Sequence, residues 1–318
     1  MKIFMIGNFR PEHSTENDIL KSLRALRHEV YTYQEDKTDS ICDYDMDDID
    51  MVLSMHTHGW QFPITEDFIR NRKVPVVAYT LDLFRGLARH DENYVKTHPW
   101  FKCKYFFQPD DPGWLRERGV NAIWMPPGVL ANSCFLAETK RDYEYDVIFV
   151  GSRDYHPEWP WRRELIDYLR QHYKDNFRLF EHSSAMRGYK LNQLYRSAKC
   201  VVGDSCFANP NSRYTSDRLF ETLGRGGRLV YPNIDWGWCL QVRDSLYGRY
   251  DVGNLSELTE AIDRTIYEEC DVPQDAYIGI IKTHHSYTRR MCEMFEYLGE
   301  REPSIKVALE RDADATNL

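Results

Sequence analysis

The sequence lacks the features that mark membrane, secreted and zinc-binding proteins. No apolar run approaches the roughly 20 residues that a membrane-spanning helix needs, and the apolar stretch at the N-terminus is too short for a secretory signal. The eight cysteines are scattered and include no Cys-x-x-Cys pair, a pattern typical of reduced thiols rather than of a disulfide framework or a zinc site. We therefore expect a cytoplasmic protein without integral membrane contact.

Signatures of two common nucleotide-binding classes are missing as well. No Gly-x-Gly-x-x-Gly follows the first apolar segment, which leaves a dinucleotide-dependent dehydrogenase with little support, and no P-loop is present. The formal net charge of −9 offers no global attraction for nucleic acid, although a local basic groove could still exist.

An Asp-x-Asp pattern at Asp43, Asp45 and Asp47 formally matches the motif of metal-dependent transferases. Such a motif should follow a strand and chelate the metal bound to a diphosphate, whereas this one lies in an acidic run before a predicted strand. We interpret the run as a solvated connection and expect no metal site.

What the sequence does contain is an alternation of short apolar segments and helical patterns. The predicted strands are residues 2–6, 29–33, 51–55, 74–80, 104–108, 122–125, 145–151, 177–180, 200–203, a segment ending at Pro232, and 249–252. The predicted helices are one opened by a capping pattern at Thr15 and Asp18, then residues 161–173, 190–197, 216–224, 255–268 and 275–298, followed by a polar and weakly structured tail beyond residue 300. This alternation predicts parallel sheets with helices on both faces.

A proline-rich connector divides the alternation in two. Residues 125–129 contain Pro126, Pro127 and Gly128, which make a stiff, non-helical link. We expect two Rossmann-like, doubly wound α/β domains facing a cleft, at residues 1–128 and 129–285. Residues 286–318 are expected to form a C-terminal helix and tail, for which a path back to the N-terminal domain remains open.

The most informative segment runs from Ser216 to Pro232. It predicts a helix carrying Glu221, a break at Gly226 and Gly227, and a short apolar strand. In a doubly wound domain such a helix begins at the nucleotide site, where its free amide groups suit a diphosphate. A carboxylate one to two turns further in can accept hydrogen bonds from ribose hydroxyls.

Several segments resemble, in the same order, those of GT-B glycosyltransferases, and among them the GT-4-like and CgeB-like branch (glycosyl transferases group 1-like). The Pro-Pro-Gly-Val connector is similar to an interdomain P-x-G-V element, and residues 146–153 resemble the first strand and loop of the donor domain. Residues 190–199 resemble the helix before the donor-site strand. Residues 214–221, Tyr-Thr-Ser-Asp-Arg-Leu-Phe-Glu, with the later Gly-Gly are similar to the Y-x-S-D-R-x-F-E…G-G pattern, and residues 283–290 resemble an H-T-Y-x-x-R segment on a late helix.

This resemblance implies a glycosyltransferase that moves a hexose-type sugar from a nucleotide-sugar donor, a UDP-sugar before others, to an acceptor hydroxyl. It implies a retaining outcome, and no obligatory cofactor or metal beyond the nucleotide-sugar co-substrate. The acceptor stays open among a glycan, a protein, a small molecule and a modified DNA base.

The resemblance also implies the main donor-binding residues. Gly151 would let the backbone approach the diphosphate, Arg153 and Arg218 would bind it, and Glu221 would hold the ribose. Instead of binding the diphosphate, Arg218 could be a surface arginine paired with a nearby acid.

Other residues enter the donor site with an open alternative. Tyr214, Ser216 and Asp217 belong to the same pattern, but Ser216 and Asp217 also suit a helix N-cap. Gly7 and Asn8 follow the first predicted strand and either contact the donor diphosphate or form a plain strand-to-helix turn.

The candidate catalytic residues follow two strands of the first domain. Ligands of open α/β sheets lie beyond the carboxyl ends of the strands, where we expect His56 and His58 after the third strand and Asp82 after the fourth. A histidine there could act on the acceptor hydroxyl or bind the donor sugar, or could be structural. Asp82 could serve as a general base or orient the acceptor.

Two observations keep other functions open. Many GT-4 enzymes have a second glutamate before the ribose-binding one, with seven residues between the two, and Arg213 takes that place here, as in a sugar-nucleotide-binding or carbohydrate-binding protein that has lost transfer. Basic clusters could track DNA phosphates or be ordinary helix-face charges; they are Arg162, Arg163, Arg170, Lys174, Arg225 and Arg228.

Overall fold

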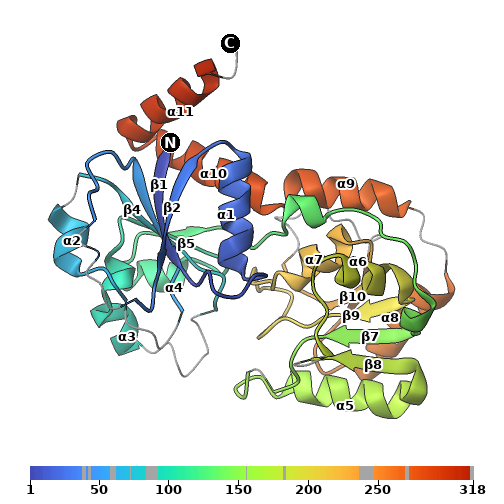
Figure 1. Cartoon of the computed structure of the whole chain (residues 1–318). Coiled ribbons are helices and arrows are strands. Elements are labelled where there is room, and N and C mark those ends of the chain that lie inside the picture. Colours follow the sequence, from blue (N-terminus) through green and yellow to red (C-terminus); the bar gives the residue numbers. More distant parts are fainter. Residues whose placement is uncertain are drawn as a thin grey trace. The chain divides into compact units, whose positions relative to one another are not determined.

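The chain divides into two compact units, each with a sheet of its own. The computed structural model (Figure 1) describes residues 1–37, 41, 44–57, 62–71, 73–83, 92–154, 156–181, 184–235, 247–268 and 272–315. The first unit combines Met1–Pro126 with Tyr287–Leu318, and the second unit is Pro127–Ser286.

A six-stranded parallel sheet forms the centre of the first unit. Its strands are β1 (Lys2–Gly7), β2 (Glu29–Gln34), β3 (Met51–Ser54), β4 (Val76–Tyr79), β5 (Tyr105–Gln108) and β6 (Ala122–Trp124). In the order β2-β1-β3-β4-β5-β6, Ile3 of β1 lies opposite both Val30 and Met51. The strand order therefore reverses between β1 and β3, which makes their carboxyl ends the switch point of the sheet.

Alternate strand residues fill two cores, because successive side chains of a strand point to opposite faces. Met5 and Leu53 belong to the core beneath two helices on one face (Figure 1), and Ile6 and Val52 to the core on the other face. The first face carries α1 (Thr15–Ala25) and α10 (Tyr287–Gly299), and the second carries α2 (Glu66–Asn71), α3 (Glu92–Thr97) and α4 (Gly113–Arg116).

The second unit has a five-stranded parallel sheet in the order β11-β10-β9-β7-β8. Its strands are β7 (Val147–Val150), β8 (Phe177–Phe180), β9 (Cys200–Val202), β10 (Leu229–Pro232) and β11 (Tyr247–Tyr250). Here the order reverses between β7 and β9.

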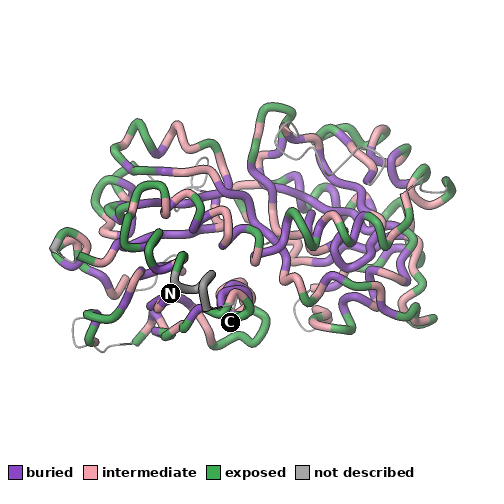
Figure 2. The backbone as a smooth tube through the Cα atoms, turned by 90° about the horizontal axis from the view of Figure 1, so that it is seen from above, coloured by how far each residue is buried: buried purple, intermediate pink, exposed green. Residues whose placement is uncertain are grey.

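Helices cover both faces of this second sheet. Phe149 packs with α5 (Trp161–Tyr173) and α8 (Leu255–Tyr267), and Ile148 packs on the opposite side with α6 (Gly188–Ser197). On that same side Tyr231 shares a core with α7 (Arg218–Gly224) and α9 (Gln274–His284). Figure 2 shows buried backbone (purple) in the interior of each unit and exposed turns (green) along its outside. The predicted α/β class is confirmed.

The predicted single helix over 275–298 is wrong. The structure has two helices there, because α9 ends at His284 and α10 begins at Tyr287. No proline or glycine marks the break. Ser286 instead pairs with Val129 in a parallel bridge, and the Val129 amide donates to the His285 carbonyl at 3.1 Å. A continuous helix would use that carbonyl for its own ladder.

The expectation of a weakly structured tail beyond residue 300 is also wrong. Helix α11 (Pro303–Ala315) begins with a proline, which suits the first helical position. Ile305 and Ala308 are buried in the core of the first unit, and the Tyr105 hydroxyl donates to Glu302 Oε1 at 2.7 Å. The sequence signal for this helix was the spacing of Ile305 and Ala308, two apolar residues three positions apart.

The N-cap of α1 lies one residue earlier than predicted. Ser14, not Thr15, occupies the cap, and its Oγ accepts from the Asn17 amide at 3.2 Å. The predicted helix itself is present.

Candidate functional site

Two loops start side by side at the carboxyl edge of the second sheet. Strand β7 ends at Val150 and its neighbour β9 ends at Val202, on the two sides of the point where the strand order reverses. In doubly wound sheets the crevice outside these strand ends is where ligands bind.

Gly151 and Arg218, two predicted donor-site residues, lie against each other at this edge. Gly151 has a φ of +142°, and a Cβ there would lie 2.6 Å from Arg218 Nη2. The Arg218 guanidinium also donates to the Val150 carbonyl. Glycine therefore lets a cation approach the backbone at the end of β7, an arrangement that suits a phosphate group.

Asp217 and Glu221 place two carboxylates one helical turn apart beside Arg218. Burial raises the pKa of Asp217 to about 6, and the Glu221 carboxylate acts in the same direction while Arg218 opposes it. Asp217 occupies the N-cap position of α7 but makes no capping hydrogen bond. The Glu221 side chain is 28% exposed, with Oε1 lying 3.4 Å from Arg225 Nη2. A carboxylate has further lone pairs, so Glu221 can still accept hydrogen bonds from a ligand.

Arg225 and Asn192 support this carboxylate, and sequence reasoning missed that role. Arg225 Nη1 donates to Asn192 Oδ1 at 2.6 Å, and Asn192 Nδ2 donates to the Ser133 and Phe135 carbonyls at 2.8 and 3.0 Å. The spacing of Glu221 and Arg225, four residues apart on a helix, was the available signal.

Arg153 is already paired with carboxylates. Its Nε donates to Asp167 Oδ1 at 3.0 Å and its Nη1 lies 3.1 Å from Asp154 Oδ1. The Arg153 amide donates to Glu181 Oε2 at 3.0 Å. To bind a diphosphate the guanidinium would have to leave Asp167, so this role stays a prediction.

Tyr231 fixes the loop that precedes α7. Its hydroxyl accepts from the Ser216 amide at 3.1 Å and lies 2.9 Å from Thr215 Oγ1 and 3.1 Å from Ser216 Oγ. Tyr214 is buried, and its carbonyl accepts from Ser205 Oγ at 3.4 Å. Ser216 and Tyr214 therefore shape this loop, and their contact with a donor stays a prediction.

A buried ion pair that the sequence analysis missed lies after β9. Asp204 is fully buried, and its Oδ2 accepts from Arg162 Nε at 2.8 Å. Trp159 Nε1 also donates to this carboxylate, at 3.1 and 3.2 Å from its two oxygens. An acid immediately after a predicted strand was the signal for it.

In the first unit, Gly7 and Asn8 form the turn that leaves β1. A Cβ at Gly7 would lie 2.8 Å from Glu16 Cγ. Asn8 Oδ1 accepts from Gln34 Nε2 at 3.2 Å, and the Asn8 carbonyl accepts from Ser14 Oγ at 2.9 Å. These contacts account for both residues without a ligand, so donor contact stays a prediction.

His56 lies after β3, where it contacts a carboxylate that sequence reasoning missed. Its Nδ1 is 3.2 Å from Glu35 Oε2, and the two side chains are 1% and 0% exposed. Glu35 directly follows β2, and its two oxygens accept from the Thr57 amide at 3.0 and 2.8 Å. His98 stacks on the His56 ring at 5.0 Å between centroids. An acid two residues beyond a predicted strand could have identified Glu35.

The remaining candidates of this edge are Asp82 and His58. Asp82 is half-buried after β4, and its amide donates to Thr80 Oγ1 at 3.0 Å. Burial raises the pKa of Tyr94 to about 12, with the Asp82 and Glu35 carboxylates acting in the same direction. His58 lies outside the described residues. The edge therefore brings His56, Glu35 and Asp82 into one neighbourhood.

Most of the basic residues considered as a DNA-tracking surface have acidic or carbonyl partners. Arg163 pairs with Asp154 at 2.8 Å, Arg170 lies 3.5 Å from Asp167, and Arg228 donates to the Glu268 carbonyl at 2.6 Å. Arg162 and Arg225 are buried. These pairings favour the interpretation as ordinary structural charges over that as a DNA-tracking surface.

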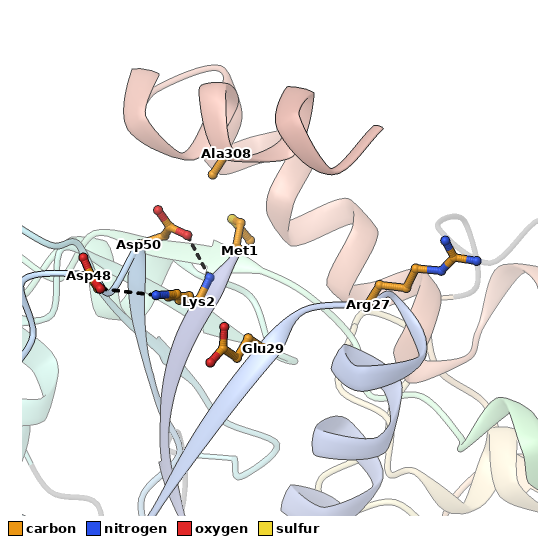
Figure 3. A pocket seen from close by; sticks show the side chains of 7 residues that line it. All are labelled: Met1, Lys2, Arg27, Glu29, Asp48, Asp50 and Ala308. Atoms are coloured by element: carbon orange, nitrogen blue, oxygen red, sulfur yellow. Dashed lines mark hydrogen bonds and ion pairs between the residues drawn. The ribbon is translucent and has the colours of Figure 1, made fainter. Parts of the chain in front are cut away.

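A hollow of about 350 Å³ lies at the opposite, amino edge of the first sheet. Figure 3 shows Lys2 and Glu29 at the starts of β1 and β2, with Asp48, Asp50 and Ala308 near them. The Lys2 amide donates to Asp50 Oδ2 at 2.7 Å, and Lys2 Nζ lies 3.3 Å from Asp48 Oδ2. Because ligands of such sheets bind at the carboxyl edge, this hollow is not the candidate site.

Two kinds of feature are absent from the described ranges. These ranges contain no group of three or more His, Cys, Asp or Glu side chains arranged to hold a metal ion. They also contain no helix with the length and apolarity to cross a membrane.

Solved structures resemble the whole chain, whereas no protein-family model and no curated protein matches its sequence. HepE of Anabaena, in complex with UDP and glucose, is 12% identical with a TM-score of 0.61, covering 94% of this chain and 100% of that one. Sucrose-phosphate synthase from Thermosynechococcus elongatus is 10% identical with a TM-score of 0.62, covering 94% and 99%. An α-glucosyltransferase in complex with UDP and a 13-mer DNA is 11% identical with a TM-score of 0.61, covering 94% and 99%.

The fold is that of the GT-B glycosyltransferases. At these identities the likeness carries the fold and no more. It does not show the CgeB-like branch, the donor or the acceptor, and these enter the proposal that follows.

Proposed function

We propose that this protein is a glycosyltransferase that moves a hexosyl group from a UDP-type nucleotide sugar to an acceptor hydroxyl. The observation that carries the proposal is the arrangement of Gly151, Arg218 and Glu221 at the switch point of the second sheet. It offers a cation over open backbone for a diphosphate and a carboxylate with free acceptor capacity for a ribose.

The finer parts of the proposal rest on the sequence resemblance. We assign the chain to the GT-4-like, CgeB-like branch, with a retaining outcome and no obligatory metal. In this assignment Arg218 contacts the diphosphate and Glu221 the ribose hydroxyls, while Arg153 joins only after leaving Asp167.

The test is a calorimetric titration of UDP into the wild-type protein and Glu221→Ala. We expect the variant to bind about 10- to 100-fold more weakly, because hydrogen bonds to a charged group contribute roughly 1.5–3 kcal/mol. Glu164→Ala is the matched control, since Glu164 is an exposed first-turn glutamate of another helix in the same unit. Equal affinities for UDP in all three proteins would contradict the proposal.

A second candidate is a nucleotide-sugar-binding protein without transfer activity. Arg213 favours it, because it replaces an expected acid and is 3.0 Å from Asp235 at the surface. Slow hydrolysis of UDP-glucose by the wild-type protein would favour the transferase, and tight binding without any turnover would favour the second candidate.

A further inference from the structure

Glu35 is a buried carboxylate whose environment is built around one histidine. It follows β2 and is 1% exposed, and a buried charge is tolerated only where hydrogen bonds compensate it. The compensation comes from the Thr57 amide, at 3.0 and 2.8 Å, and from His56 Nδ1, at 3.2 Å. Both partners belong to the segment that leaves β3.

This contact decides which nitrogen of His56 carries a proton. An ionised carboxylate only accepts hydrogen bonds, so the Nδ1 facing it must be the donor. A neutral imidazole then has its lone pair on Nε2. Nε2 is buried and has no hydrogen-bond partner among the described residues.

Aromatic rings restrict the orientation of the imidazole. His98 stacks on it with an interplanar angle of 24°, and Phe62 and Trp100 meet it edge-on with centroids 5.2 and 5.3 Å away. With Nδ1 fixed by Glu35 and the plane fixed by these rings, Nε2 keeps one direction.

We propose that Glu35 is a positioning residue that holds His56 in the Nδ1–H tautomer and so presents Nε2 to a hydroxyl group of a sugar. The inference rests on the proposed function for the identity of that ligand. The hydroxyl belongs either to the donor sugar or to the acceptor, and the same nitrogen would accept its hydrogen bond in both cases.

The experiment is ¹⁵N NMR of the histidine rings at a pH where the imidazole is neutral, with the His56 signals assigned by their loss in His56→Phe. In the wild-type protein we expect a protonated Nδ1 and an unprotonated Nε2. In Glu35→Gln the single amide oxygen is taken by the Thr57 amide, which turns the NH₂ group toward Nδ1. We therefore expect the proton to move to Nε2.

Glu16→Gln is the matched control. Glu16 is a nearby carboxylate whose pKa burial raises and whose charge interacts with Glu35, yet no hydrogen bond to His56 is found for it. The other titratable groups in this neighbourhood are Asp82, Tyr94 and His98. If Glu35 acts through its direct hydrogen bond, Glu16→Gln keeps the wild-type tautomer.

Three added probes distinguish the source of the hydroxyl. A shift of the Nε2 signal with UDP-glucose but not with UDP assigns it to the donor sugar. A shift with free glucose in the presence of UDP assigns it to an acceptor. No shift with any of the three overturns the ligand role.

A protonated Nε2 in the wild-type protein, or an unchanged tautomer in Glu35→Gln, overturns the positioning role. The wild-type spectrum needs no variant, so it decides even if Glu35→Gln fails to fold. If instead UDP binding is insensitive to Glu221→Ala while the tautomer is as expected, the proposed function fails and the Glu35–His56 pairing stands.

Discussion

Among the described residues, each unit fully buries one carboxylate just beyond a strand of its sheet, and the two differ in their partner. Asp204 of the second unit is held by Arg162 and Trp159, whereas Glu35 of the first unit is held by His56 and the Thr57 amide. Both carboxylates are at most 1% exposed.

The difference shows that equally buried carboxylates can have different roles, one in stability and one in ligand binding. A guanidinium is always charged, so Arg162 neutralises Asp204 within the unit and the pair needs no ligand. An imidazole gives one nitrogen to the acid and keeps the other, so the His56–Glu35 pair leaves a polar atom for a ligand. We expect the first pair to matter most for stability and the second for binding.

The largest expected effect on stability comes from removing the cation of the Arg162–Asp204 pair. Arg162→Met leaves Asp204 buried without its cation, and we expect the free energy of unfolding to fall by about 3–5 kcal/mol. Urea unfolding followed by circular dichroism measures it.

Arg163→Met is the control for this prediction. Arg163 lies next to Arg162 in the chain and pairs with Asp154 at the surface. Both side chains are more than half exposed, and such pairs contribute at most about 1 kcal/mol to stability. Equal losses in the two variants would show that Arg162–Asp204 is not a structural anchor.

A smaller loss of stability is expected when the imidazole of the His56–Glu35 pair is removed. His56→Phe removes one hydrogen bond to Glu35 but leaves the Thr57 amide, so we expect about 1–2 kcal/mol. The exposed His13→Phe should stay within about 0.5 kcal/mol of the wild-type protein. A loss for His56→Phe as large as that for Arg162→Met would remove the contrast between the two pairs.

Local patterns predicted most of the fold. The helix at Trp161–Tyr173 and the strand at Phe177–Phe180 have the predicted bounds, because apolar spacing within one segment specifies them. The break after His284 depends instead on a bridge to Val129, more than 150 residues away, which no local pattern contains.

The candidate site was harder to predict for the same reason. The sequence identified His56 and Glu221 by their places after a strand and on a helix, and their roles stay predictions. It missed Glu35 and Asp204, because their partners become neighbours only once the strand order is known. An acid at or just beyond a strand end is a signal that applies to both.

The last expected effect depends on pH and concerns Asp217, for which no hydrogen bond from an arginine is found among the described residues. Burial raises its pKa to about 6, above the roughly 3.9 of an unfolded chain. The folded state therefore favours the protonated acid. The stability that Asp217 contributes is complete below about pH 4 and is lost as the pH rises through about 6. A difference of about two pKa units corresponds to roughly 3 kcal/mol, which is the upper limit of this contribution.

The measurement compares urea midpoints of the wild-type protein and Asp217→Asn at several pH values from 4 to 7. Because the variant cannot ionise at this position, its stability should gain on that of the wild-type protein as the pH rises. Asp263→Asn, at an exposed position of α8, should show a constant difference instead. Parallel pH profiles for Asp217→Asn and the wild-type protein would mean that Asp217 is as well compensated as Asp204.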